Sequence, residues 1–158
     1  MVKTDRTKLS REIFDEVYDE IHESALRVSD DFWAYHSMQN AKMKKSGGEV
    51  SYLNPMVRRT ADYTMKIVWV KTNFKKKADG TYQRQSDHIK KKRGPIYNMD
   101  VLLAKAPSWE HESVKQAEND FAFLRRRLNH LTKIGYHIRL YEELMQSKKV
   151  EAPDPVEF

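Results

Sequence analysis

Two runs of basic residues, Lys75–Lys77 and Lys90–Arg93, stand out in the middle of the sequence. The aromatic residues Trp69, Phe74 and Tyr82 are interleaved with them. Ammonium and guanidinium groups neutralise phosphates and aromatic rings stack on bases, so this combination is typical of a nucleic-acid-binding surface. Two other interpretations remain open: a solvated charged face without a partner, and a surface for anionic membranes.

The positive charge is concentrated in one segment of the 158-residue chain. The formal net charge is +6, yet residues 39–105 contain 16 Lys and Arg against five Asp and Glu, which leaves the two ends mildly acidic. Because locally gathered charge steers partners more than the total does, we predict that the middle segment binds nucleic acid. The candidate binding residues are Lys75, Lys76, Lys77, Arg84, Lys90, Lys91, Lys92, Arg93, Arg58, Arg59, Trp69, Phe74 and Tyr82.

The basic segment has the pattern of a small antiparallel sheet. A turn at 52–55 precedes a strand at 63–72, in which Met65, Ile67 and Trp69 share one face by the period of two. Asp79-Gly80 predicts a tight hairpin turn, after which 81–89 returns as a second strand. A short third strand is expected at 96–103.

Two long amphipathic helices frame this segment. Residues 7–43 show apolar side chains at steps of three and four, namely Leu9, Ile13, Val17, Ile21, Ala25, Val28 and Phe32. A second helix is expected at 108–147, with Ser108 as a capping residue. Its seam is Val114, Ala117, Phe121, Leu124, Leu128 and Leu131, continued after a shortened step by Ile134, Ile138, Tyr141 and Met145.

These elements predict an α+β fold in which two long antiparallel amphipathic helices carry a small antiparallel β-hairpin or sheet inserted between them. Residues 1–148 are expected to form a single domain, with a basic β insert at 50–103 and a flexible tail at 149–158. A seam this long between only two helices is seldom stable alone, so we expect a homodimer.

Catalysis is not expected. The chain has no cysteine, its five glycines form no phosphate-binding loop, and its six histidines are scattered without a metal-ligand spacing. We therefore predict no catalytic residue, no metal and no cofactor. An enzyme acting on nucleic acid would need a tightly bound divalent metal. No apolar run is long enough for a membrane helix, which favours a cytoplasmic protein with no membrane partner.

The arginine run Arg125–Arg127 has two interpretations. It either extends the phosphate-binding surface or pairs with acidic residues of the first helix, as flanking positions of paired helices commonly do. The acidic candidates are Asp15, Glu16, Asp19 and Glu20.

Several short patterns in the second half of the chain resemble the C-terminal part of the conjugative mobilisation protein family MobI. They are Pro95-Ile96-Tyr97, 106–110 (Ala-Pro-Ser-Trp-Glu), 118–122 (Glu-Asn-Asp-Phe-Ala) with Leu124-Arg125-Arg126, and 131–134 (Leu-Thr-Lys-Ile). The resemblance implies an auxiliary factor of conjugative DNA transfer that acts at an origin of transfer alongside a separate relaxase. It carries no family motif of functional residues onto this sequence.

The leading hypothesis is therefore a non-enzymatic DNA-binding accessory protein that contacts duplex rather than single-stranded DNA and has a relaxase or other transfer protein as partner. The alternatives are a helical adaptor, whose basic segment meets an acidic protein surface, and a small DNA-binding transcriptional regulator of a mobile element.

Overall fold

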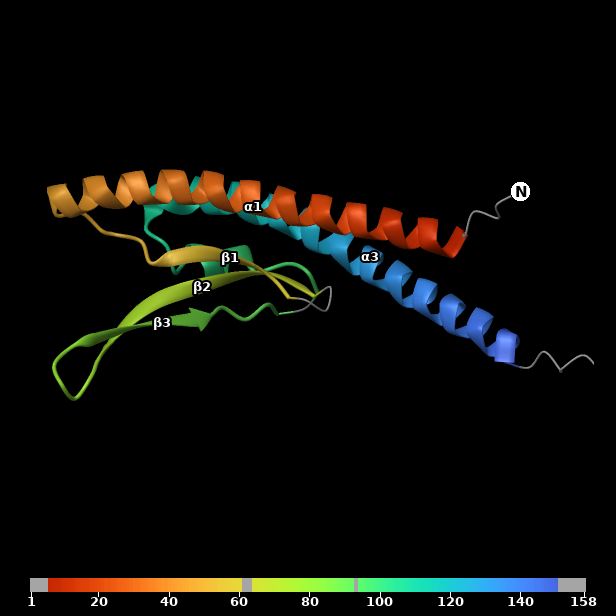
Figure 1. The fold of residues 1–158 in the computed structure, drawn as a ribbon. Coiled ribbons are helices and arrows are strands. Elements are labelled where there is room, and N and C mark those ends of the chain that lie inside the picture. The colour runs from red at the N-terminus through yellow and green to blue at the C-terminus, as the bar shows by residue number, and fades with distance from the viewer. Residues whose placement is uncertain (1–5, 61–63, 93, 151–158) are drawn as a thin grey trace, which may run out of the picture.

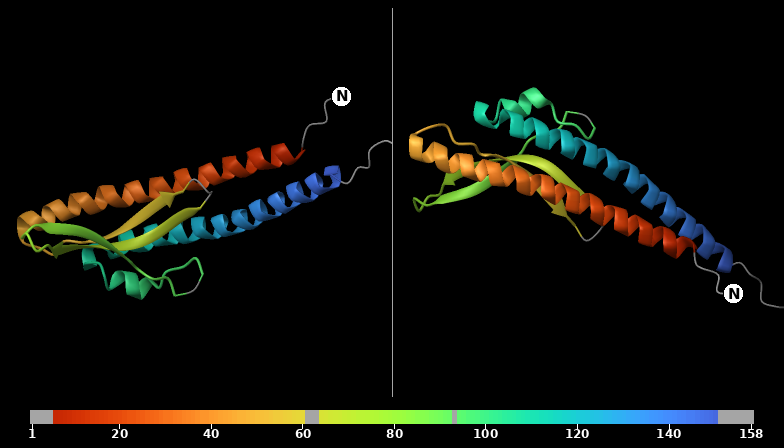
Figure 2. Two further views of the ribbon diagram at one scale, coloured as in Figure 1. Left: turned by 60° about the horizontal axis from the view of Figure 1, so that its bottom comes forward. Right: turned by 90° about the horizontal axis from the view of Figure 1, so that it is seen from above.

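Two long antiparallel helices and a three-stranded sheet make up the fold, which confirms the predicted α+β class (Figure 1). The computed structural model describes residues 6–60, 64–92 and 94–150. The helices lie side by side and the sheet packs beneath them, as the further views in Figure 2 also show. The elements are α1 (Arg6–Ser46), β1 (Leu53–Arg59), β2 (Met65–Lys76), β3 (Tyr82–His88), α2 (Met99–Leu103), the 3₁₀ turn η1 (Ser108–Glu110) and α3 (His111–Val150).

The sheet is antiparallel with strand order β1-β2-β3, and β1 and β3 pair with largely different parts of the long strand β2. β1 pairs with the first part of β2, up to Leu53 opposite Lys71. β3 pairs with the second part, from Val70 opposite His88 to Lys76 opposite Tyr82. Consequently the end of the hairpin is a two-stranded ribbon that extends past β1. The predicted turn is confirmed, with Gly80 at φ +86°.

One face of the sheet packs on the helices. Met65, Ile67 and Trp69 are buried there, as the alternating pattern predicted. The Trp69 ring meets Phe32 of α1 edge-on at 5.2 Å between centroids and Phe121 of α3 at 5.9 Å. Such contacts, together with burial of the rings, tie the sheet to both helices.

The buried stripe of α1 differs partly from the predicted one. Ile13 is 53% exposed, whereas its neighbour Phe14 is buried, and Tyr18 takes the place expected of Val17, which is half-buried. The predicted residues 9–25 recur at steps of four, and each such step turns about 40° beyond one full turn of a 3.6-residue helix, so that stripe leaves the buried face. The buried residues Phe14, Tyr18, Ile21 and Ala25 alternate steps of four and three instead. In α3 the seam to Leu131 is confirmed, but the buried side continues through the half-buried Gly135 and Ile138, so Ile134, Tyr141 and Met145 are exposed.

Three smaller predictions are wrong. Residues 52–55 are not a turn, because β1 begins at Leu53. Residues 96–103 do not form a third strand: Asn98 caps the helix α2, its side chain accepting from the backbone N–H of Asp100 at 3.0 Å. Ser108 does not cap α3, which begins at His111 after η1. One boundary also differs: α3 continues through residues 149 and 150 of the expected tail, and 151–158 lie outside the described residues.

Gly135 permits the close approach of the two helices far from the sheet. A Cβ atom at this position would lie 2.6 Å from Cε2 of Phe14. Phe14 is buried. We expect Gly135→Ala to lower the free energy of unfolding by about 1–3 kcal/mol through overpacking, although alanine has the higher helix propensity. Urea denaturation would measure this loss, and a gain in stability would show that the contact is not tight.

Candidate nucleic-acid interface

The second face of the sheet, which we name the outer face, points away from the helices. It contains the β2 side chains that alternate with Met65, Ile67 and Trp69, together with the side chains opposite them on β1 and β3. Its cations are Arg58, Lys66, Lys76 and Arg84, and its aromatic residues are Tyr52, which directly precedes β1, Phe74 and Tyr82. Its other residues are Asn54, Met56, Val68, Val70, Thr72, Ser86 and His88. No carboxylate occurs among these outer-face residues.

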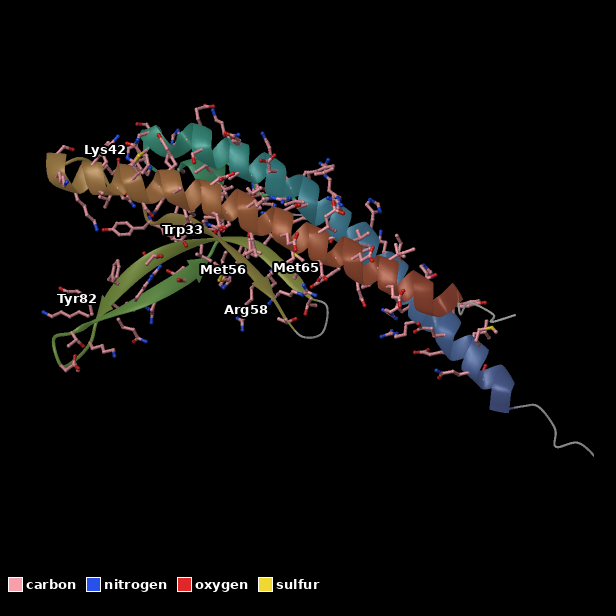
Figure 3. All side chains as sticks on the ribbon, turned by 45° about the horizontal axis from the view of Figure 1, so that its top comes forward. Trp33, Lys42, Met56, Arg58, Met65 and Tyr82 are labelled. Atoms are coloured by element: carbon pink, nitrogen blue, oxygen red, sulfur yellow. The ribbon has the colours of Figure 1, made fainter. Side chains whose placement is uncertain are left out.

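Cations and aromatic rings are paired across the strands of the outer face. Arg58 lies opposite Lys66, and Arg84 lies opposite Phe74. Lys76 lies opposite Tyr82 next to the hairpin turn. Figure 3 shows Arg58 on the side of the sheet away from the helices and Tyr82 at the end of the ribbon. The outer face thus carries cations at both ends of the sheet, with uncharged residues between them.

The exposed rings on this face are Tyr52, Phe74 and Tyr82, at 42%, 54% and 67% exposure. Tyr52 was not among the sequence candidates, because the turn assigned to 52–55 hid its alternation with Asn54. Its ring packs against Phe74 at 6.0 Å. Trp69 is the opposite case and is removed as a candidate: it is fully buried, and its Nε1 donates to Glu118 at 2.8 Å.

The inner side of the ribbon has mixed charge. Lys75 is exposed there, and Lys77 begins the hairpin turn. However, Lys71 lies opposite Asp87, whose carboxylate also accepts a hydrogen bond from Asn73. The two sides of the ribbon therefore differ in charge, and only the outer one lacks acids.

The second basic run lies at the base of the ribbon, directly after β3. Lys90, Lys91 and Lys92 are exposed, and Arg93 lies outside the described residues. Nζ of Lys91 lies 5.9 Å from the centroid of the buried Tyr97 ring. Partial burial, and secondly the charge of Arg125, lower the pKa of Lys91.

Two of the arginines considered for phosphate binding, one a candidate residue and one from the arginine run, are engaged within the fold. Arg59 forms an ion pair with Asp19 at 2.5 Å and lies 4.7 Å over the Tyr18 ring, so it is tied to α1 rather than presented to a ligand. Arg127 pairs with Glu20 of α1 at 3.1 Å, as one interpretation of the arginine run proposed.

Arg125 follows neither interpretation, because it is buried and pairs with Glu118 of its own helix at 2.9 Å. The middle residue of the run, Arg126, is exposed.

No group of three or more His, Asp and Glu side chains is close enough to hold a metal ion within residues 6–60, 64–92 and 94–150. In the same ranges, no helix has both the length and the hydropathy needed to cross a membrane.

These features define the chain as an α+β protein in which a long helical hairpin supports a sheet with a basic, aromatic outer face. The model of one protein family, described as MobI protein, matches residues 21–139, a range that includes the whole sheet. The chain therefore belongs to the MobI family and is a mobilisation-related protein. Neither the curated proteins nor the solved structures gave a match.

Proposed function

We propose that this protein is a non-enzymatic, cytoplasmic accessory factor of conjugative transfer that binds duplex DNA through the outer face of its sheet. It acts at an origin of transfer, alongside a separate relaxase. The observation that carries this proposal is the outer face itself, where four cations and three exposed rings occur without a carboxylate. Membership of a mobilisation family supports the proposal, because mobilisation acts on DNA.

The shape of the sheet favours a duplex. A two-stranded antiparallel ribbon fits the major groove of B-DNA, and here the ribbon formed by the ends of β2 and β3 extends past β1. Lys76 and Arg84 lie on this ribbon, whereas Arg58 and Lys66 lie at the opposite end of the sheet, so cations at both ends of the outer face can contact phosphates on both sides of a groove.

The direct test measures affinity for a duplex and for a single strand of the same sequence over a series of salt concentrations. If the four outer-face cations contact phosphates, the logarithm of the association constant falls against the logarithm of salt concentration with a slope of about −3.6 or steeper. Duplex affinity that does not depend on salt would contradict the proposal.

The basic run at the base of the ribbon is expected to contribute to the same binding. Changing Lys90, Lys91, Lys92 and Arg93 to glutamine should make the salt slope less steep, because each lost phosphate contact reduces the magnitude of that slope by about 0.9. The measurement is the same salt series on the duplex. Unchanged affinity would place the contact surface on the ribbon alone.

We further propose that the active form is a homodimer held by the exposed apolar side chains of α3. Phe123, Ile134, Tyr141 and Leu144 are each more than half exposed on this helix, at 53–61%. Apolar side chains that recur along a helix favour a helical partner. Ile134→Glu with Leu144→Glu should convert the dimer to a monomer in sedimentation experiments, whereas Gln146→Glu should not. A wild-type monomer at micromolar concentration would contradict this part.

A second candidate function is that of an adaptor for another transfer protein. A groove of about 400 Å³ runs between α1 and α3, and none of its lining residues belongs to the sheet. Tyr35 and Trp109 line it, together with the carboxylates of Asp31, Glu112 and Asp120. Competition with generic DNA separates the two functions. If excess DNA abolishes binding of the partner protein, the partner and DNA use the same basic face. If partner binding persists, the helical groove is the adaptor site.

A further inference from the structure

A small cleft opens at the base of the ribbon, next to the outer face. Its volume is about 330 Å³, and it is formed by the start of β2, the loop after β3 and the middle of α3. Its polar side chains are Lys66, Lys91, Arg125 and Asn129, and no carboxylate is among its lining residues in the described part of the chain. The cleft therefore presents positive charge and one amide group to a ligand.

The cleft exists because β3 stops short of the first part of β2. Pairing between β2 and β3 begins only at Val70, so the β2 edge before it faces the loop and α3 instead. Arg125 covers this edge, donating from Nε to the carbonyl oxygen of Ile67 at 2.7 Å and from Nη1 to that of Pro95 at 2.8 Å. The wall of the cleft is thus held rigidly by a buried side chain.

Arg125 has hydrogen-bonding capacity left. A guanidinium carries five N–H groups, and the bonds of Arg125 to Ile67, Pro95 and Glu118 number four within the described residues. Glu118 itself is fully buried and does not line the cleft. The Glu118 carboxylate neutralises the charge of the Arg125 guanidinium within the protein. The charges of Lys66 and Lys91 therefore remain to attract a ligand.

Lys91 and Arg125 share one aromatic ring beside the cleft. Nζ of Lys91 and the guanidinium carbon of Arg125 lie 5.9 Å and 4.8 Å from the centroid of the same Tyr97 ring. The pKa of Lys91 is lowered by burial and then by Arg125, and Glu118 opposes this only in part. An anion placed between the two cations would relieve their repulsion.

We propose that this cleft binds one phosphate group, held chiefly by Lys66 and Lys91. Lys66 also belongs to the outer face and lies opposite Arg58, so the cleft adjoins this pair of cations at the base of the sheet. The inference rests on the proposed function only for the source of the phosphate, which is a backbone diester of bound DNA. A terminal or inorganic phosphate has the same chemistry and is separated by the test below.

The first arm of the test uses inorganic phosphate alone, titrated at constant ionic strength and followed by NMR through the side-chain amide of Asn129. Wild-type protein and Lys133→Gln should show a saturable shift, and Lys91→Gln should lose it. Lys133→Gln is a matched control, because it removes the same charge from an exposed position one turn of α3 beyond Asn129 and does not line the cleft. A linear response in wild type, or a saturable one in Lys91→Gln with an unchanged unfolding midpoint, overturns the site.

The second arm uses duplexes that differ only at their 5′ ends. A 5′-hydroxyl duplex that shifts Asn129 and displaces inorganic phosphate identifies a backbone diester as the ligand. A response only to the 5′-phosphorylated duplex identifies a terminal phosphate and supports the site with the other source. A duplex that binds without moving Asn129 overturns the role in DNA contact. Saturable phosphate binding without any DNA binding would contradict the proposed function and leave the cleft established.

Discussion

Replacing Arg125 with methionine is expected to lower the free energy of unfolding by about 3–5 kcal/mol, the largest effect of any single substitution considered for this protein. Arg125 and Glu118 form a buried ion pair, with both side chains at most 5% exposed. Methionine would remove the paired charge of the Glu118 carboxylate, which would keep hydrogen bonds from the N–H groups of Trp69 and Tyr97 among the described residues. It would also leave the carbonyl oxygens of Ile67 and Pro95 without their donor.

Urea denaturation measures this loss, and two variants make the interpretation specific. Arg126→Met changes an exposed neighbour and should alter stability by no more than about 0.5 kcal/mol. The double variant Glu118→Gln with Arg125→Met should regain part of the loss, because the uncompensated charge is gone. A loss below about 1 kcal/mol for Arg125→Met would show that the pair is not needed to join α3 to the sheet.

Neutralising the outer face is expected to have the largest effect on DNA binding. With Arg58, Lys66, Lys76 and Arg84 changed to glutamine, the salt slope should become less steep by about 3.6, and affinity at low salt should fall on the order of a hundredfold or more. All four side chains are exposed on strands, away from the core, so the fold should persist. Fluorescence anisotropy of a labelled duplex would measure both quantities.

The matched control removes the same charge from the helices. Arg27, Arg126, Lys133 and Arg139 are exposed on α1 and α3, and their change to glutamine should leave the salt slope close to that of the wild type. If the two fourfold variants lose equal affinity, net charge rather than the outer face determines binding.

The fold could be predicted from the sequence wherever the spacing of apolar residues indicated which face of an element is buried. The long helices, the hairpin turn at Gly80 and the buried face of β2 all follow from local spacing. The boundary between β3 and α2 did not, because a run of apolar residues at 101–103 suits either a strand or a helix and the cap at Asn98 decided it.

Buried charge was beyond sequence reasoning. Glu118 and Arg125 occur among many similar residues on a polar helix, and only the sheet packed against that helix makes them a buried pair. A second network is similar: the buried Glu110 bonds to His36 of α1 and Ser51 before β1, three segments far apart in the chain. No local pattern signals such contacts.

The candidate site was predictable in charge but not in geometry. The sequence indicated a basic, aromatic segment, and Phe74, Lys76, Tyr82 and Arg84 share one face as cross-strand pairs. Register decided the rest. It placed Tyr52, which the sequence candidates omitted, on the outer face, whereas Trp69, which the alternation already grouped with Met65 and Ile67, is buried with them on the inner face.

The most direct test of DNA contact through the outer face is photo-crosslinking from neighbouring positions of β3. Arg84 and Ser86 point to the outer face, whereas Gln83 and Gln85 point to the inner side of the same ribbon. We predict that a photoreactive side chain crosslinks to a bound duplex from positions 84 and 86 and not from 83 and 85. Crosslinks only from 83 and 85, or equally from all four positions, would contradict DNA binding through the outer face.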